Sequence, residues 1–235
     1  MTVRFVTGTD TDVGKTITTA ALAAALVADG RSVAVYKPVQ AGTGEHGDGD
    51  VDTVRRLADV TVAEGVRLPE PMAPVAAATR AGVALPPARA HLDRIAELAA
   101  HHDDVLVEGA GGVLVHLDHD ATTLADLAEG AEAVVVCRSG LGTLNHTDLV
   151  LEALARRDVA VAGLVIGSWP AAPSEIDLDN RVELARRAPL LGAIPERSGA
   201  LSPDRFRALA PGWADPTIRL TWRSWLPQAL SDSHQ

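Results

Sequence analysis

The chain of 235 residues is poor in cysteine, aromatic residues and lysine. The single cysteine, Cys137, cannot form an intramolecular disulfide, which excludes a disulfide-stabilised secreted scaffold and favours the reducing cytoplasm. With two Phe, one Tyr and four Trp, a core has to be filled mainly by Ala, Val and Leu. The 47% hydrophobic content is sufficient for such a core, so disordered and collagen-like classes are also excluded.

Basic residues are outnumbered as well. Thirty-one acidic residues against 21 basic ones give a formal net charge of −10, which repels phosphate backbones, and no local basic stripe compensates. The most apolar N-terminal stretch, residues 17–28, is too short to span a bilayer and follows two aspartates rather than basic residues. We therefore expect no nucleic-acid partner, no membrane association and no secretion.

Apolar segments alternate with helical patterns along the chain. The expected strands cover residues 3–7, 32–36, 104–109, 133–138, 159–167 and 190–195. The expected helices cover residues 15–29, 50–57, 87–100, 122–129, 143–156 and 175–188. Strands that are apolar throughout are buried on both faces, so the pattern predicts an α/β fold with a parallel sheet wrapped by helices on both faces.

No linker divides the sequence, so we expect a single domain over residues 1–235. Residues 65–87 are rich in proline and lack a strong period, which predicts a long irregular connection. The last residues, about 213–235, contain three tryptophans and are expected to form either a packed tail or a dimer contact.

The segment GTDTDVGKT, residues 8–16, stands between the first strand and the first helix, where a nucleotide-binding P-loop belongs. Its glycines allow backbone N–H groups to turn towards phosphates, and Lys15 can reach the β and γ oxygens. The Thr16 hydroxyl can ligate Mg²⁺. One extra residue separates Gly8 from Gly14 relative to the strict motif, and a plain glycine-rich turn is the alternative interpretation.

Two acidic positions are candidates for holding Mg²⁺, which prefers one or two carboxylates together with water and phosphate oxygens. Glu108 ends a predicted strand at the carboxyl edge of the sheet, where open α/β folds bind ligands. The second candidate is Asp50, at the start of a predicted helix. Spacing alone leaves Asp48 and Asp52 open as alternatives to it.

Two further features indicate an anion site. Lys37 follows the second predicted strand and should emerge beside the P-loop, where it can neutralise charge that develops during phosphoryl transfer. Thr143 opens a predicted helix and is expected to be its N-cap. The free N–H groups of that helix, with Asn145, could bind a substrate carboxylate, although a purely structural cap is the alternative.

Five motifs in this order resemble the dethiobiotin synthetases: VTGTDTDVGKT, YKPVQAG, LVEGAGG, LGTLNH and AGLVIGSWP. The resemblance extends over residues 3–197. It implies a homodimeric P-loop α/β enzyme of biotin biosynthesis that uses Mg²⁺, ATP and CO₂ or bicarbonate to close the ureido ring of 7,8-diaminononanoate. The implied route is a carbamate and then a carbamic-phosphoric mixed anhydride, and the products are dethiobiotin, ADP and phosphate.

The resemblance also implies roles for individual residues. The implied catalytic residues are Lys37, Lys15 and Thr11, and the implied metal ligands are Thr16, Asp50 and Glu108. Nucleotide contacts are implied for Asp12, Val13, Gly14, Lys15, Thr16, Ile17, Asp50, Glu108, Gly109, Ala110, Gly111, Gly167, Ser168, Pro195, Glu196 and Arg197. Substrate contacts, the last four of them across the dimer interface, are implied for Thr11, Lys37, Ala41, Gly142, Thr143, Leu144 and Asn145.

Two positions depart from the family pattern. Ala41 stands where a Ser or Thr is common, so a hydroxyl contact to substrate is missing unless Thr43 or a water replaces it. Gly167, followed by Ser168, stands where an Asn usually reads adenine. We therefore hypothesise relaxed base selectivity, with CTP or GTP accepted alongside ATP.

Two other classes share the motif set in part. An ATP-dependent amide ligase acting on a corrinoid or a nucleotide would usually carry an additional glutaminase domain, for which 235 residues leave no room. A partition-type ATPase switch that binds DNA or membrane surfaces would need a basic patch or a basic amphipathic helix, which the sequence lacks.

Overall fold

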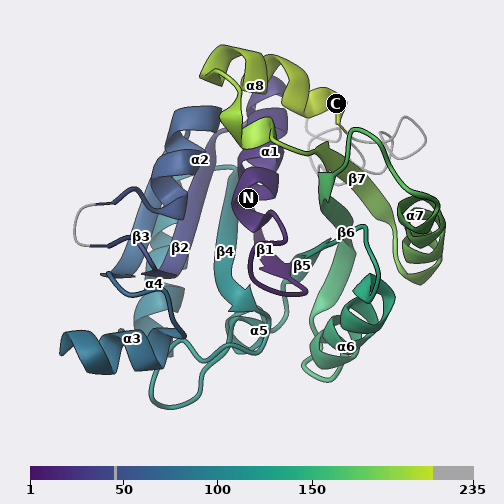
Figure 1. The fold of residues 1–235 in the computed structure, drawn as a ribbon. Helices are drawn as coiled ribbons and strands as arrows, with labels where there is room; N and C mark the ends of the chain where they lie inside the picture. The colour runs from purple at the N-terminus through teal and green to yellow at the C-terminus, as the bar shows by residue number, and fades with distance from the viewer. Residues whose placement is uncertain (45–46, 214–235) are drawn as a thin grey trace, which may run out of the picture.

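The structure, a computed structural model, describes residues 1–44 and 47–213. Its centre is a seven-stranded sheet in the order β3-β2-β4-β1-β5-β6-β7, with every neighbouring pair parallel (Figure 1). The strands are β1 (Thr2–Gly8), β2 (Val33–Ala41), β3 (Thr61–Leu68), β4 (Asp104–Gly112), β5 (Glu132–Cys137), β6 (Ala160–Trp169) and β7 (Leu190–Pro195). The α/β parallel-sheet prediction is thus confirmed.

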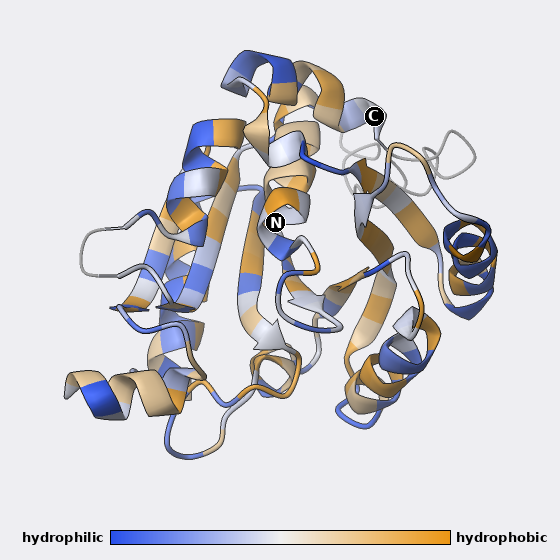
Figure 2. Ribbon diagram, viewed as in Figure 1, coloured by the Kyte–Doolittle hydropathy of each residue, from blue (hydrophilic) through white to orange (hydrophobic). Residues whose placement is uncertain are grey.

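Helices cover both faces of this sheet. They are α1 (Lys15–Ala28), α2 (Asp50–Ala58), α3 (Pro74–Ala81), α4 (Ala88–His101), α5 (Leu124–Leu127), α6 (Thr143–Ala155), α7 (Glu175–Arg187), α8 (Pro203–Leu209) and the 3₁₀ turns η1 (Ser198–Ala200) and η2 (Ala210–Gly212). Adjacent strand residues enter opposite cores: Phe5 and Tyr36 pack with α3 to α7, whereas Val6 and Val35 pack with α1, α2 and α8. This two-sided burial explains the apolar strands seen in Figure 2.

The irregular connection predicted over residues 65–87 is wrong in two places, since β3 covers its first residues and α3 its middle. β3 is an edge strand with only Leu68 fully buried, so it lacks the continuous apolar run of the inner strands. α3 begins at Pro74 and ends before Gly82, which has a φ of 65°. A proline at the first position and a glycine after the last are helix boundaries, which the proline content alone concealed.

Three strands run further than predicted. β2 continues through Pro38 to Ala41, β4 to Gly112 and β6 to Trp169. Opposite Pro38 stands Gly65 of β3, where an added Cβ would lie 2.2 Å from the Pro38 carbonyl oxygen. The glycine thus permits a close approach to the strand at the proline, beyond the apolar run on which the prediction for residues 32–36 was based.

Cys137 ends β5 and is fully buried, and burial raises the pKa of its thiol to about 12. Trp213 packs edge-on against Phe206 of α8, with ring centroids 5.1 Å apart. The rest of the predicted tail, including Trp222 and Trp225, lies outside the described residues. Within the described ranges no helix is both long and apolar enough to cross a bilayer.

Candidate active site

The loop of residues 9–14 connects β1 directly to the first turn of α1. Asp12 and Gly14 adopt left-handed conformations, with φ of 55° and 96°. Lys15, nearly buried, folds back so that its Nζ donates to the Asp10 carbonyl oxygen at 2.9 Å. Burial lowers the pKa of Lys15, and the nearby positive charge of Lys37 lowers it further.

Lys37 and Glu108 meet because β2 and β4 are neighbours whose register pairs Tyr36 with Val107. The Lys37 Nζ lies 2.8 Å from Glu108 Oε1, 2.5 Å from Asp50 Oδ2 and 2.9 Å from the Gly109 carbonyl oxygen. The hydroxyl of Thr16 donates to the same Glu108 oxygen at 2.9 Å. A lysine, two carboxylates and the P-loop threonine therefore form one cluster.

Burial and charge oppose each other in this cluster. Burial alone would lower the pKa of Lys37, but Glu108 and Asp50 outweigh it and the net shift is upward. Burial would raise the pKa of Asp50, but the Lys37 ammonium outweighs it and the net shift is downward. For Glu108 burial prevails, aided by the charge of Asp50, and its pKa is raised. Lys37 is therefore held as an ammonium and Asp50 as a carboxylate.

The cluster opens into a cavity of about 790 Å³ between the P-loop, β2 and the segment before α3. Its polar side carries Lys15, Lys37, Thr16 and Asp50. Its apolar wall comes from Val39, Ala41, Pro71, Met72, Ala73, Pro74 and Val115. The cavity can therefore hold a molecule that is charged at one end and apolar along its length.

Eleven of the 23 predicted site residues line this cavity. Those that line it are Thr11, Asp12, Gly14, Lys15, Thr16, Ile17, Lys37, Ala41, Asp50, Ala110 and Gly111. Glu108 and Gly109 contact Lys37. Val13 is buried, and a Cβ added at Gly8 would lie 2.7 Å from one of its methyl groups. Of the three aspartates left open, Asp50 faces Lys37, Asp52 pairs with Arg67 and Asp48 is exposed.

Other predicted residues do not line the cavity. Gly167 and Ser168 lie at the end of β6, and Pro195 ends the neighbouring strand β7, followed by Glu196 and Arg197; the Glu196 N–H donates to the Trp169 carbonyl at 2.8 Å. Gly167 packs against the P-loop, where an added Cβ would lie 2.0 Å from the Val13 carbonyl oxygen. Close backbone packing thus accounts for glycine at this position independently of any base contact.

The N-cap prediction for Thr143 is wrong. Gly142, with a φ of 90°, occupies the cap, and Thr143 is the first helical residue, its hydroxyl donating to the Arg138 carbonyl at 2.7 Å. A left-handed cap excludes a threonine in practice, because a β-branched residue is strained there. Gly142 has no side chain with which to cap this first turn of α6, in which Leu144 is half-buried and Asn145 exposed.

Sequence reasoning missed three residues around the site. The Arg138 guanidinium donates to the Asp10 carboxylate at 3.0 Å and to the Thr11 carbonyl at 3.3 Å, so it ties β5 to the P-loop. Gln40 and Arg67 hold the start of α2. Arg138 could have been found from its place directly after a buried strand. Arg67 had no such signal, since its strand was not predicted.

The donor set at the cluster fits Mg²⁺. The Thr16 hydroxyl and the Asp50 and Glu108 carboxylates are hard oxygen donors beside a phosphate-binding loop. No group of three or more His, Cys, Asp or Glu side chains in residues 1–44 and 47–213 could hold a metal by itself. Mg²⁺ takes few protein ligands and completes its shell with phosphate and water.

Comparison with known proteins gives the family. Residues 3–203 match the model of a family described as an AAA domain. The ATP-dependent dethiobiotin synthetase of Streptomyces avermitilis is 53% identical over 232 residues, covering 94% of this chain and 95% of that protein. The corresponding synthetase of Mycobacterium sp. strain JLS is 50% identical over 222 residues, covering 92% and 97%.

Solved structures share the fold at lower identity. The septum site-determining protein MinD of Pyrococcus horikoshii, complexed with Mg-ADP, superposes with a TM-score of 0.61 at 20% identity, covering 98% of both chains. Cobyrinic acid a,c-diamide synthase of Mycobacterium smegmatis, with bound ADP and magnesium, gives 0.55 at 20% identity, covering 96% and 97%. These likenesses show the fold alone. Because about half of its residues are identical to those of these synthetases over nearly the whole chain, the chain belongs to the ATP-dependent dethiobiotin synthetase family.

Proposed function

We propose that the protein carboxylates 7,8-diaminononanoate and closes its ureido ring at the expense of ATP, giving dethiobiotin, ADP and phosphate in biotin biosynthesis. The observation that carries the proposal is the position of Lys37, a buried ammonium beside the P-loop that faces a cavity with an apolar wall. An ammonium there can hold a carbamate next to the γ-phosphate. The apolar wall suits the methylene chain of the diamine.

The proposed reaction has three steps. One amine of the substrate adds to CO₂ and loses a proton, which gives a carbamate. A carbamate oxygen then attacks the γ-phosphorus, ADP leaves, and a carbamic-phosphoric anhydride forms. The second amine attacks the carbonyl carbon, loses a proton and expels phosphate as the ring closes.

The chain's own residues would bind and orient the reactants. Lys37 and the Thr11 hydroxyl would hold the carbamate, and Lys15 would leave the Asp10 carbonyl for the β and γ oxygens of the nucleotide. Thr16, Asp50 and Glu108 would hold Mg²⁺, which when bound neutralises phosphate charge. Because the Lys37 ammonium is already in place before the reaction, it would stabilise the negative charge that develops in the transition state without having to reorient.

The protein would act as a homodimer. The first turn of α6, Gly142 to Asn145, lies outside the cavity, so it would receive the substrate carboxylate from the partner's cavity. Exposed apolar side chains near this turn support such a contact: Leu141 is 90% exposed, and Leu149, Ile176 and Val182 are exposed on α6 and α7. Light scattering on the purified protein should give twice the chain mass.

Base selectivity would be relaxed, with CTP or GTP accepted alongside ATP. Gly167 offers only backbone to a base, and Ser168, Pro195, Glu196 and Arg197 lie at the neighbouring strand ends. A panel of nucleoside triphosphates tests this, and a strict requirement for ATP would refute it. We place the reaction in the cytoplasm, where a lone buried thiol such as Cys137 stays reduced.

The experiment that tests the proposed activity measures phosphate release from Mg-ATP and bicarbonate, with and without 7,8-diaminononanoate, and follows the organic product by mass spectrometry. We expect release that depends on the diamine, with one product molecule, the diamine plus one carbonyl, per phosphate. Hydrolysis that ignores the diamine would leave nucleotide binding intact but overturn the substrate.

A further inference from the structure

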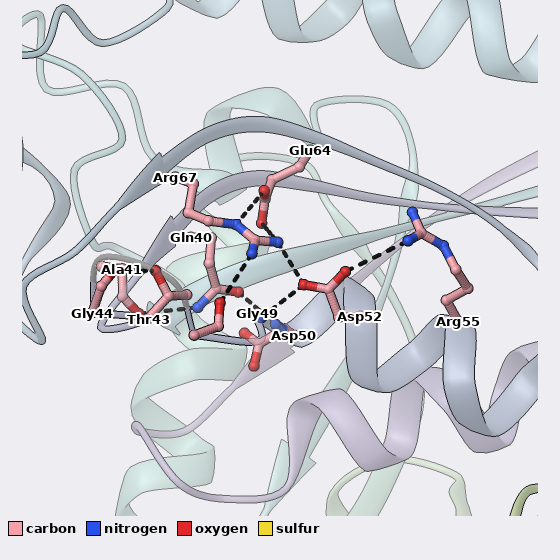
Figure 3. A network of polar contacts seen from close by, with 11 residues as sticks. Gln40, Ala41, Thr43, Gly44, Gly49, Asp50, Asp52, Arg55, Glu64 and Arg67 are labelled. Carbon is pink, nitrogen blue, oxygen red and sulfur yellow. Dashed lines mark hydrogen bonds and ion pairs between the residues drawn. The ribbon is translucent and has the colours of Figure 1, made fainter.

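Asp50 is the first residue of α2, so the direction of its carboxylate depends on how the start of that helix is held. A short carboxylate on a helix terminus has little freedom of its own, because its reach is fixed by the backbone of one turn. The contacts that fix this backbone therefore decide whether Asp50 can serve the cluster around Lys37. Figure 3 shows these contacts, which come from β2, β3 and α2 itself.

Gln40 of β2 holds the backbone of Asp50 directly. Its side-chain oxygen accepts the Asp50 N–H at 2.8 Å, and its amide nitrogen donates to the Ala41 carbonyl oxygen at 3.0 Å. Gln40 is nearly buried. It thus satisfies one of the free N–H groups of the helix and ties that group to the strand that carries Lys37.

Arg67 of β3 holds the residue before Asp50 through a second side chain. The Asp52 Oδ2 accepts the Gly49 N–H at 2.9 Å, and the same oxygen accepts from Arg67 Nη2 at 2.7 Å. Arg67 is itself fixed, because its Nε donates to Glu64 Oε2 at 2.8 Å and its Nη1 to the Gly47 carbonyl oxygen at 3.2 Å. All three nitrogens of the planar guanidinium are thus used, and Nη2 donates to Glu64 Oε1 at 3.3 Å as well as to Asp52.

The side chains of Arg67 and Gln40 pack closely around Gly49. A Cβ added there would lie 2.9 Å from Arg67 Nη2 and 3.2 Å from the Gln40 side chain. The helix start is therefore enclosed between Arg67 and Gln40 rather than lying free on the surface. The Arg67 guanidinium therefore lies close against Gly49, one peptide before Asp50.

We propose that Arg67, acting through Asp52 and Gly49, is a positioning residue for Asp50 and thereby sets the affinity of the site for its divalent cation. The inference rests on the proposed role of Asp50 as a metal ligand. The Arg67–Asp52 pair is about one-third exposed, with side-chain exposures of 35% and 27%, so as an ion pair it contributes little to stability. Its effect is on the direction of the Asp50 carboxylate.

The chain offers a matched control. Arg55 also pairs with Asp52, but at 3.6 Å and through Oδ1, the oxygen that does not accept the Gly49 N–H. Arg55 is 60% exposed. Removing Arg55 therefore takes the same charge from the same carboxylate without touching the helix start.

The test measures Mn²⁺ binding in the presence of ADP by electron paramagnetic resonance, where free Mn²⁺ gives the signal, for wild type, R67M, R55M and D50N. We expect R67M to weaken Mn²⁺ binding about ten- to a hundredfold, as loss of a partner that orients a metal ligand usually does. R55M should leave Mn²⁺ binding unchanged. R67K keeps the charge but cannot supply three donors in one plane, so its affinity should be intermediate. This variant carries the test if R67M does not fold.

The outcomes separate the inference from the function on which it rests. If D50N leaves Mn²⁺ affinity unchanged, the metal role of Asp50 fails. If D50N weakens binding but R67M and R67K do not, the inference alone is overturned. If R67M and R55M weaken binding equally, loss of charge explains the effect and Arg67 does not position Asp50.

Discussion

The Lys37 Nζ and Glu108 Oε1 atoms lie 2.8 Å apart, and their side chains are only 3% and 1% exposed. Two charges so deeply buried are costly to desolvate and are retained where they are paired and hydrogen-bonded. Asp50 on one side and the Thr16 hydroxyl on the other complete that pairing. The arrangement therefore fixes a positive charge beside the P-loop, and we do not count the ion pair as a source of stability for the fold.

Replacing Lys37 by Arg tests whether this charge must be a compact ammonium. A guanidinium keeps the charge but is larger and planar, so it cannot lie among Asp50, Glu108 and the Gly109 carbonyl as the Nζ does. We expect turnover to fall by about 10²–10³ while nucleotide affinity is retained. Steady-state kinetics and ADP titration measure the two quantities, and near-normal turnover would remove Lys37 from the mechanism.

Asp50→Asn and Asp52→Asn rank the neighbouring carboxylates. Asp50 contacts the cluster itself, whereas Asp52 reaches it only through the backbone. Asp50→Asn should therefore raise the Mg²⁺ concentration needed for half-maximal activity far more than Asp52→Asn does. A magnesium titration of both variants decides, and the opposite order would assign the metal ligand to Asp52.

Gly167→Ala tests the contact between β6 and the P-loop. The added methyl would lie 2.0 Å from the Val13 carbonyl oxygen, so the loop or the strand has to shift, which costs roughly 1–3 kcal/mol. We expect weaker nucleotide binding, measured by calorimetry. Gly140→Ala is the control, since an added Cβ there meets nothing within 4 Å. Equal affinities for the two variants would show that the loop does not depend on this contact.

The buried side chain of His91 is expected to make the free energy of unfolding depend on pH. It is buried, and its Nδ1 lies 2.7 Å from the Tyr36 hydroxyl. Burial lowers the pKa of His91, and the charge of Asp118 offsets only part of the effect. Between this lowered pKa and the value of about 6.5 in the unfolded chain, only the unfolded state binds the proton. The free energy of unfolding should therefore fall as pH drops below about 6.5.

The check on this prediction is urea unfolding at pH 7.5 and 5.5 for wild type, His91→Gln and His119→Gln. His119 is exposed and serves as the control. We expect the stability lost between the two pH values to be smaller in His91→Gln than in the other two proteins. An equal loss in all three would mean that His91 does not contribute to the pH dependence.

The sequence predicted the elements whose local signals agree with their surroundings. Inner strands such as β5 are apolar throughout because both of their faces are buried. The P-loop was recognised from the spacing of its glycines and lysine between a strand and a helix. β3 was not predicted, because an edge strand containing Glu64, Gly65 and Arg67 has no apolar run. The network around Asp50 depends on that strand and therefore also escaped prediction.

Within the candidate site, ambiguity lay in register. Asp48, Asp50 and Asp52 have the same chemistry and lie within five residues, and only the helix start decides which of them faces Lys37. The cap of α6 was misplaced by one residue for a similar reason. Gly142 and Thr143 both suit a helix start, and the left-handed backbone at Gly142 is a property of the turn.

Transfer of oxygen from CO₂ to phosphate tests the central claim most directly. The protein is mixed with C¹⁸O₂, Mg-ATP and 7,8-diaminononanoate, the reaction is quenched before the label exchanges with water, and the released phosphate is examined by mass spectrometry. If the carbamate attacks the γ-phosphorus, one of its oxygens stays on the phosphate when the ring closes, so each phosphate should carry one ¹⁸O. Phosphate without label, released alongside product, would contradict the mixed anhydride and with it the role proposed for Lys37.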